Sequence, residues 1–250
     1  MILALETATT ACSVALCDAG GRVLAEVVAP DGPAHTQRLL PGVHEVLARA
    51  GAGWADVGTV AAGLGPGAFT GLRIGVATAR ALAQADGRAR LAGVPTPAAL
   101  ALALRELSPD APTLVPLIDG RRRELFAAVY EPDGDGVRLV AGVRVVPVAE
   151  APSWLAGLDR PVVGGDGVAL LAGALPAGVA DAGVPAPTAA MVGRAVALGA
   201  PGFVTGPDAV LPLYGRAPDA ARWQGPAAGS SGPAPEPAAA PPAAAGEARP

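Results

Sequence analysis

The sequence predicts an α/β protein with two similar lobes and a disordered C-terminal tail. Two strand-rich stretches, starting near Ile2 and near Thr113, are each followed by alternating helix and strand patterns, as in α/β domains. The residues at 108–112 between them include two prolines and no apolar periodicity, which is typical of a linker. Residues 225–250 contain no Val, Ile, Leu, Met or aromatic residue, so they cannot bury enough apolar surface to offset the entropy of ordering. We therefore expect lobes at 1–107 and 108–216 and a disordered tail at 217–250.

The first lobe begins with an antiparallel meander and continues with alternating helices and strands. Residues 36–50 place their apolar side chains within about 120° of one another, which predicts an amphipathic helix that ends at Gly51. Pro41 fits its first turns if this helix begins near Arg38 or Leu39. The Gly20-Gly21 pair suits a tight hairpin turn. In chain order we expect strands at 2–6, 13–17 and 23–28, the helix at 36–50, a strand at 59–64, a helix at 71–85, a strand at 90–94 and a helix at 97–107.

The second lobe starts with strands again and continues with helix and strand patterns. We expect strands at 113–118, 125–130, 136–145 and 161–164, and helices at 166–174 and 188–198. The likeness between the lobes lies in this general pattern, because the sequence shows no repeat of individual residues.

The composition excludes several classes of function. The chain has 250 residues, and 51% of them are hydrophobic. Its net charge of −4 argues against a chain that binds nucleic acid by itself, without a partner protein. All 18 basic residues are arginine, which excludes lysine-dependent phosphate loops and Schiff-base chemistry. The sequence contains no uninterrupted apolar run of about 18 residues. Its N-terminus lacks the basic lead and cleavage site of a signal peptide, so we expect a cytoplasmic protein without membrane contact.

The cysteines and histidines do not form a metal site in the predicted elements. Cys12 and Cys17 lie five residues apart in an expected strand, so they point to opposite faces and are expected to be reduced core thiols. His35 and His44 lie nine residues apart, which is half a turn on one helix, so they cannot share a metal. Without a G-x-S-x-G elbow, neither histidine supports a serine-hydrolase triad.

The glycine-rich segment at 63–75 has three interpretations. As a dinucleotide fingerprint it matches only loosely, because the acidic partner Asp86 closes a helix instead of ending a strand. As an anion site, Thr70 would cap the following helix and the free amides of 71–73 would bind phosphate. As a tight crossover, the glycines would let one backbone segment pass close to another. The residues alone leave the anion site and the crossover equally open.

Two further polar clusters allow a binding interpretation. Glu6 precedes the hydroxyl-rich turn Thr7-Ala8-Thr9-Thr10, which could hold a phosphate or a metal-bound water, although such a sequence is more often only a turn. Arg121-Arg122-Arg123 forms a basic cluster in an expected turn, for which a solvated loop is the more common role.

The helix at 71–85 is expected to be buried on both sides. Leu72, Val76, Ala79 and Ala83 form one apolar face, a second apolar face lies opposite, and only a narrow polar strip separates them. A lobe of this size cannot easily bury both faces, so we expect a helical partner. The expected interface consists of Leu72, Ile74, Val76, Ala77, Ala81 and Ala85 on this helix with Leu40, Val43 and Leu47 on the helix at 36–50.

Together these segments resemble the TsaB (YeaZ) family. The resemblance rests on Ile2 to Thr9 with Cys12 to Leu16, on His35 to Pro41, and on Gly65 to Gly75. It continues through Ile118 to Glu124, Gly164 to Gly167 and Pro212 to Arg216, and so covers residues 1–216 in register. It implies a two-lobed fold of the actin, hexokinase and heat-shock-chaperone (ASKHA) type.

The resemblance also implies a role in bacterial tRNA modification. Members take part in the synthesis of threonylcarbamoyladenosine, on the adenosine 3′ of the anticodon in tRNAs that read codons starting with A. A TsaB protein is the non-catalytic partner of its paralogue TsaD, which carries the metal and the transferase chemistry, and the ATPase TsaE joins the complex. The resemblance implies that this chain is not an enzyme, has no metal of its own, needs no cofactor, pairs with TsaD through a helical bundle, and meets tRNA only through the complex. A homodimer when alone and weak ATP or ADP binding at the complex interface stay open.

A vestigial anion or nucleotide site would consist of Glu6, Thr7, Thr9, Thr70, Gly71 and Gly165. Glu6 stands where the family more usually has Asp. The alternative function is an ATP-dependent phosphotransferase of the same superfamily that uses Glu6, Thr70 and the turn at 164–167 around a nucleotide. A glycoprotease-like metallopeptidase is disfavoured, because the histidine pair of the catalytic paralogue is absent.

Overall fold

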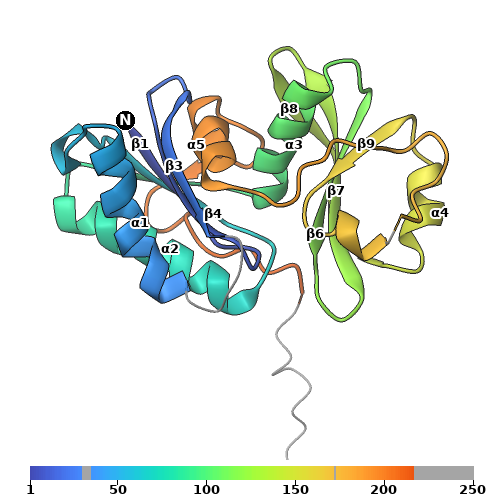
Figure 1. Cartoon of the computed structure of the whole chain (residues 1–250), viewed down its shortest axis with the longest axis horizontal. Coiled ribbons are helices and arrows are strands. Elements are labelled where there is room, and N and C mark those ends of the chain that lie inside the picture. The colour runs from blue at the N-terminus through green and yellow to red at the C-terminus, as the bar shows by residue number, and fades with distance from the viewer. Residues whose placement is uncertain (30–34, 172, 217–250) are drawn as a thin grey trace, which may run out of the picture. The chain divides into compact units, whose positions relative to one another are not determined.

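Two mixed β-sheets, which share the order of five strands, form the framework of the protein (Figure 1). The computed structural model describes residues 1–29, 35–171 and 173–216. The first sheet contains β1 (Ile2–Glu6), β2 (Cys12–Cys17), β3 (Val23–Ala29), β4 (Thr59–Gly63), β5 (Arg90–Val94) and β11 (Val204–Thr205). The second contains β6 (Thr113–Asp119), β7 (Glu124–Asp133), β8 (Gly136–Pro147), β9 (Pro161–Gly164) and β10 (Ala180–Asp181).

The strand order repeats from one sheet to the other. The first sheet runs β11-β5-β4-β1-β2-β3 and the second runs β10-β9-β6-β7-β8. In each, three consecutive antiparallel strands form a meander, and two later strands add in parallel beside the first strand of that meander. The predicted α/β class with two similar units is therefore confirmed at the level of topology.

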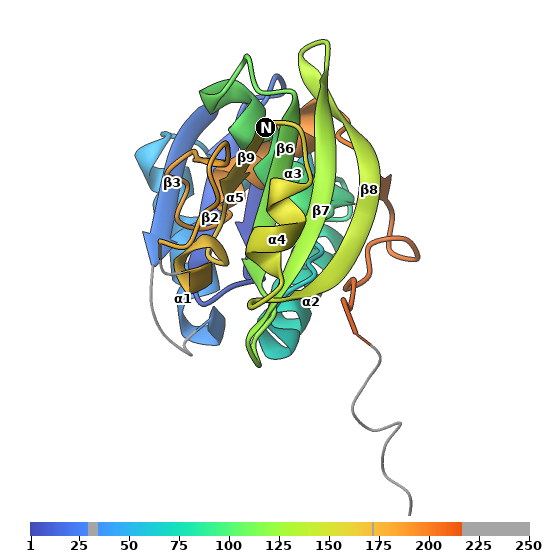
Figure 2. The ribbon, with the colours of Figure 1, turned by 90° about the vertical axis from the view of Figure 1, so that its right-hand side faces the viewer.

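Helices cover the sheets in layers (Figures 1 and 2). The helices are α1 (His35–Arg49), α2 (Phe69–Asp86), α3 (Thr96–Leu107), α4 (Ala151–Ala156) and α5 (Ala189–Ala197), with 3₁₀ turns η1 (Trp54–Asp56) and η2 (Val168–Leu171). Helices α1 and α2 cover one face of the first sheet, while α5 packs on its other face. Helix α3 lies between α5 and the second sheet, whose far face is covered by α4 and η2.

Alternation along each strand decides which core a side chain enters. On β1, Leu3 and Leu5 face α1 and α2, whereas Ala4 faces α5. The same period of two places Cys12 in the α1–α2 core and Cys17 in the α5 core. Both cysteines are free and buried, so the prediction that they lie on opposite faces is confirmed.

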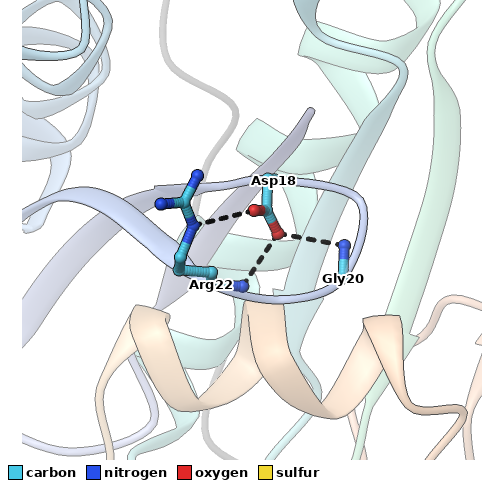
Figure 3. Close-up of polar contacts among 3 residues, drawn as sticks. All are labelled: Asp18, Gly20 and Arg22. Atoms are coloured by element: carbon cyan, nitrogen blue, oxygen red, sulfur yellow. Dashed lines mark hydrogen bonds and ion pairs between the residues drawn. The ribbon is translucent and has the colours of Figure 1, made fainter.

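The turn between β2 and β3 is organised by one aspartate (Figure 3). The Oδ1 atom of Asp18 accepts hydrogen bonds from the amides of Gly20 (3.0 Å) and Arg22 (2.9 Å), and Oδ2 pairs with the Arg22 guanidinium at 3.0 Å. These contacts hold the pKa of the Asp18 carboxyl below its usual range. Gly21 has a φ of +84° and lies against α5, where a Cβ would approach Ala197. The glycine predicted for this turn is thus needed for both its conformation and its packing.

Two predicted helices differ from the structure, and α4, η1, β10 and β11 were not predicted. Helix α1 begins at His35 instead of Arg38 or Leu39, so Pro41 lies inside it. The lost hydrogen bond is tolerated because buried Leu39 and Val43 anchor the helix on both sides of the proline. The helix expected at 166–174 is only the short turn η2, and the positive φ of Gly173 (+79°) is incompatible with a helix that continues to residue 174. Helix α4 carries no apolar periodicity long enough to predict it, being six residues long.

The C-terminal part of the second half returns to the first sheet. Helix α5 contacts β1 and β2, and β11 pairs antiparallel with β5, with Val204 opposite Gly93. The boundary predicted at residue 107 therefore separates the two meanders. It does not separate the two sheets, because α5 and β11 lie after this boundary and contact the first sheet.

The predicted tail at 217–250 lies outside the described residues. Contacts within the chain separate Met1–Gly215 from Arg216–Pro250. No helix among the described residues is long and apolar enough to cross a membrane.

We expect a chain that ends at Arg222 to keep its melting temperature within about 3 °C of the full-length value, because the residues removed contain only one large apolar side chain. Differential scanning calorimetry of both chains measures this. A drop of about 10 °C or more would show that the tail stabilises the fold.

Candidate functional site

The carboxylate of Glu6 lies at the end of β1 and is fully enclosed by its own chain. Its side chain is 1% exposed. The Oε1 atom accepts hydrogen bonds from the amides of Thr7 (2.8 Å) and Ala8 (2.7 Å), and Oε2 accepts one from the Thr96 hydroxyl at 2.9 Å. Thr96 begins α3, and its hydroxyl also accepts the Gly65 amide at 3.1 Å. Glu6 therefore links β1, the glycine-rich segment and α3.

Burial changes the acidity of this carboxyl group. Desolvation raises the pKa of Glu6 to about 7, and the hydrogen bonds from the two amides and Thr96 oppose that rise. The charge of Asp166, on the turn after β9, raises the pKa of Glu6 further. The turns that follow β1 and β9 are thus close enough to interact electrostatically.

The glycines of the segment at 63–75 make room for the turn after β1. A Cβ on Gly63 would collide with the Glu6 carboxylate, one on Gly67 with the Ala8 carbonyl, and one on Gly75 with the Thr7 hydroxyl. The Ala68 amide also donates to the Ala8 carbonyl at 2.6 Å. Of the interpretations that the sequence left open, these contacts favour the tight crossover.

The residues predicted to bind an anion are brought together only in part. Thr7 and Thr9 are buried beside Glu6, and the Thr7 hydroxyl donates to the Gly71 carbonyl at 2.9 Å. The Thr9 hydroxyl accepts the Ala11 amide at 3.3 Å. The prediction that Thr70 caps the helix is wrong: α2 begins at Phe69 with Ala68 as its N-cap, and Thr70 is an exposed residue of the first turn.

Gly165 lies in the second sheet's glycine turn and has a structural reason to be glycine. Its amide donates to the Val184 carbonyl at 2.7 Å, and a Cβ would collide with the Leu117 carbonyl. The next residue, Asp166, accepts the Asp119 amide at 3.1 Å. Burial raises the pKa of Asp166 to about 6; the hydrogen bond from the Asp119 amide opposes this rise, the charge of Asp119 adds to it, and the charge of Arg121 opposes it.

The sequence did not indicate that Thr96 and Asp166 interact with Glu6. A threonine before Pro97 suggests only a helix start, and its hydroxyl is used instead to bind a residue 90 positions away. Among the described residues, no group of three or more His, Cys, Asp or Glu side chains could hold a metal ion. His44 lies exposed on α1, and the side chain of His35 falls outside what the structure describes.

The two apolar faces of α2 have different surroundings. Leu72, Val76, Ala79 and Ala83 are buried against the first sheet. Ala77, Ala81 and Ala85 are exposed and point away from the core, whereas Ile74 is half-buried and packs at its edge. Of the predicted interface, Leu72 and Val76 on α2 and Val43 on α1 are wrong, because their side chains are enclosed in the chain's own core. Ile74, Ala77, Ala81 and Ala85 with Leu40 and Leu47 stay as the predicted interface, which we call the α1–α2 outer face.

The polar strip of α2 binds the C-terminal segment. The Arg80 guanidinium donates to the carbonyls of Pro207 (2.7 Å) and Val210 (3.2 Å). Nearer the start of the helix, Arg73 donates to the Tyr214 hydroxyl at 2.9 Å and lies 3.9 Å from the centre of the Phe69 ring. Phe69 and Tyr214 are half exposed and their ring centres lie 5.2 Å apart, and the sequence did not indicate either of them as a site residue.

The partly buried glycine at 67 provides a direct test of the crossover. We expect Gly67→Ala to lower the free energy of unfolding by about 1–3 kcal/mol, because the new methyl group must displace the Ala8 carbonyl. Gly142→Ala is the matched control, since its Cβ would enter open space in β8. Urea unfolding of both variants measures the difference. Equal stability for the two variants would contradict the close approach at Gly67.

Comparison with known proteins identifies the relatives of this chain. The family described as "TsaD: tRNA N6-adenosine threonylcarbamoyltransferase" matches residues 22–159. The chain is 38% identical over 136 residues to the tRNA threonylcarbamoyladenosine biosynthesis protein TsaB of Escherichia coli, which covers 54% of this chain and 57% of that protein. It thus spans little more than half the length of that curated relative.

Two further relatives match over nearly their full length. An uncharacterized protein of Mycobacterium tuberculosis is 34% identical over 220 residues, which are 88% of this chain and 93% of that protein. The solved structure of YeaZ from Pseudomonas aeruginosa is 32% identical, with a TM-score of 0.68, and covers 85% of this chain and 98% of its own.

Proposed function

The chain belongs to the TsaB (YeaZ) family, and on this premise we propose that it is a non-catalytic subunit in the synthesis of threonylcarbamoyladenosine in tRNA. With a TsaD-type transferase and a TsaE-type ATPase, it would support transfer of the threonylcarbamoyl group to the adenosine 3′ of the anticodon in tRNAs that read codons starting with A. The chain itself would use no cofactor, would meet tRNA only through the complex, and would work in the cytoplasm.

The enclosed carboxylate of Glu6 is the observation that carries this proposal. A carboxylate that positions a magnesium ion or a nucleotide needs an oxygen available to the ligand or to its water. Both oxygens of Glu6 are instead occupied by the Thr7 and Ala8 amides and the Thr96 hydroxyl, and the side chain is buried. The geometry at this turn supports a structural role, which favours a scaffold over the phosphotransferase considered from the sequence.

The α1–α2 outer face supports the partner part of the proposal. It presents Leu40, which is 50% exposed, and the small side chains Ala77, Ala81 and Ala85. Small residues on a helix allow a partner helix to approach closely, so a bundle with helices of the transferase is the arrangement that fits this surface.

The test is a reconstituted tRNA modification reaction with purified transferase and ATPase subunits. We expect Glu6→Gln to change the rate of threonylcarbamoyl incorporation by less than about twofold, because a glutamine can accept the same amide hydrogen bonds. A reaction without this chain is the control for its requirement. A hundredfold fall in rate with the complex still assembled would show that Glu6 takes part in the chemistry. Micromolar ATP binding with turnover by the isolated chain would favour the phosphotransferase instead.

A further inference from the structure

The turn between β6 and β7 holds three consecutive arginines in an unusual backbone conformation. Arg121, Arg122 and Arg123 have φ values of 62°, 52° and 60°, in the left-handed region that disfavours residues with a Cβ. Glycine or asparagine would adopt this conformation at lower cost. The arginine side chains are therefore placed at positions where the backbone alone would favour other residues.

Hydrogen bonds to the end of β6 and from the residue after β8 hold this turn in place. The Arg121 amide donates to Oδ1 of Asp119 at 2.7 Å, and the Val148 amide donates to the Arg123 carbonyl at 2.9 Å. Across the base of the turn, Gly120 and Glu124 are joined by a hydrogen bond of 2.8 Å from amide to carbonyl. The directions in which the three side chains leave the backbone are thus fixed by the sheet.

Three arginines and one aspartate surround a hollow at this turn. A cavity of about 270 Å³ is lined by the three arginines with Asp119, Val148 and Leu170. Asp119 pairs with Arg121 at 3.1 Å. Within the described part of the chain, no carboxylate lies at ion-pair distance from Arg123, whereas Arg22 and Arg138 on other hairpins each have one.

We propose that this turn binds a backbone phosphate of the tRNA substrate when the complex is assembled. The inference rests on the proposed function, because it takes tRNA as the substrate. Guanidinium groups bind phosphate oxygens in a planar, bidentate geometry, so a fixed row of arginines suits a phosphodiester. The cavity is smaller than a pocket that encloses a whole nucleotide, so an exposed polymer backbone fits it better than a free nucleotide. With a net charge of −4, the chain would make this contact as part of a larger binding surface.

The test measures tRNA kinetics in the reconstituted complex with variants of Arg123. Arg123→Asn removes the charge and keeps a residue that tolerates the left-handed conformation, so its melting temperature should not fall. We expect this variant to raise KM for tRNA about tenfold at roughly 100 mM salt, with kcat within about twofold of wild type. The salt dependence of tRNA binding to the complex, measured by fluorescence anisotropy, should have a slope smaller by about 1. Arg123→Lys should recover most of the affinity, and Arg138→Asn, which removes an exposed arginine from β8, should behave as wild type.

Several results would overturn the proposal. An unchanged KM for tRNA in Arg123→Asn would do so, as would equal losses in Arg123→Asn and Arg138→Asn, which would show a general effect of charge. A rise in KM for ATP instead of tRNA would assign the turn to a free nucleotide. If the wild-type chain does not stimulate modification at all, the proposed function itself fails. If wild type stimulates and Arg123→Asn matches it, only the phosphate contact fails.

Discussion

Ala83→Glu is expected to unfold the protein, whereas Ala81→Glu should leave it folded but unable to bind its transferase partner. The two alanines lie two positions apart on α2 and belong to its opposite faces. Ala83 is 7% exposed and packs in the core between α2 and the first sheet. A glutamate there would be both too large and uncompensated in charge, which costs several kcal/mol of a total stability of about 5–15 kcal/mol.

Ala81 is exposed and lies on the α1–α2 outer face. A glutamate at this position reaches solvent in the free chain, so far-ultraviolet circular dichroism should match wild type. In the complex it would be trapped unpaired between helices, so gel filtration with the transferase should show no co-elution. Gln84→Glu is the matched control, since it adds the same charge on the polar strip of α2 and should still bind. If both alanine variants fold and bind with wild-type affinity, α2 is not the interface.

The stability of the protein is expected to fall as pH rises from about 5 to 8, with Glu6 as a main cause. Burial raises the pKa of this carboxyl from 4.5 to about 7, so the folded state binds a proton that the unfolded state releases. The contribution of Glu6 to the free energy of unfolding is therefore largest below pH 4.5 and declines between pH 4.5 and 7. Above pH 7 this contribution no longer changes with pH. A shift of this size corresponds to about 3 kcal/mol over the whole window.

Glu6→Gln isolates this contribution. Glutamine resembles the protonated form and cannot ionise, so urea unfolding of the variant should lose the part of the pH dependence that Glu6 supplies. Asp166, whose pKa is also raised by burial, stays in both proteins and accounts for a remaining slope. The measured quantity is the difference between the two proteins at pH 5 and pH 8. Parallel curves for wild type and variant would show that Glu6 does not titrate in this range.

Local periodicity predicted most of the fold. The strand at 2–6 and the helix at 97–107 were predicted within one residue, because each carries its apolar pattern over its whole length and ends at a residue that breaks it. Pairings across long stretches of chain were not predictable in this way. Strand β11 has only two residues and is defined by its pairing with β5, which lies more than 100 positions earlier in the chain.

The sequence indicated which residues belong to the candidate site but not which of them contact one another. Glu6 and the glycine segment at 63–75 stood out by residue type, yet nothing local indicates that Gly63 makes room for a carboxylate. The outer and inner faces of α2 could be listed from helical geometry, but both are apolar, so only the sheet decides which is buried. In each case the missing information is which distant segment packs against the residue.

The return of α5 and β11 to the first sheet bears on how the protein is made. The face of β1 that carries Ala4 stays open to solvent until Val192 and Ala195 have been synthesised, almost 200 residues later. During translation the meander of β1, β2 and β3 therefore exposes an apolar surface until α5 has been made. Such an exposed surface favours chaperone binding and aggregation. A fragment that ends at residue 107 lacks α5, so its apolar surface on β1 would stay exposed. The two halves, although alike in topology, should consequently fold as one cooperative unit whose rate is limited by closing this long loop.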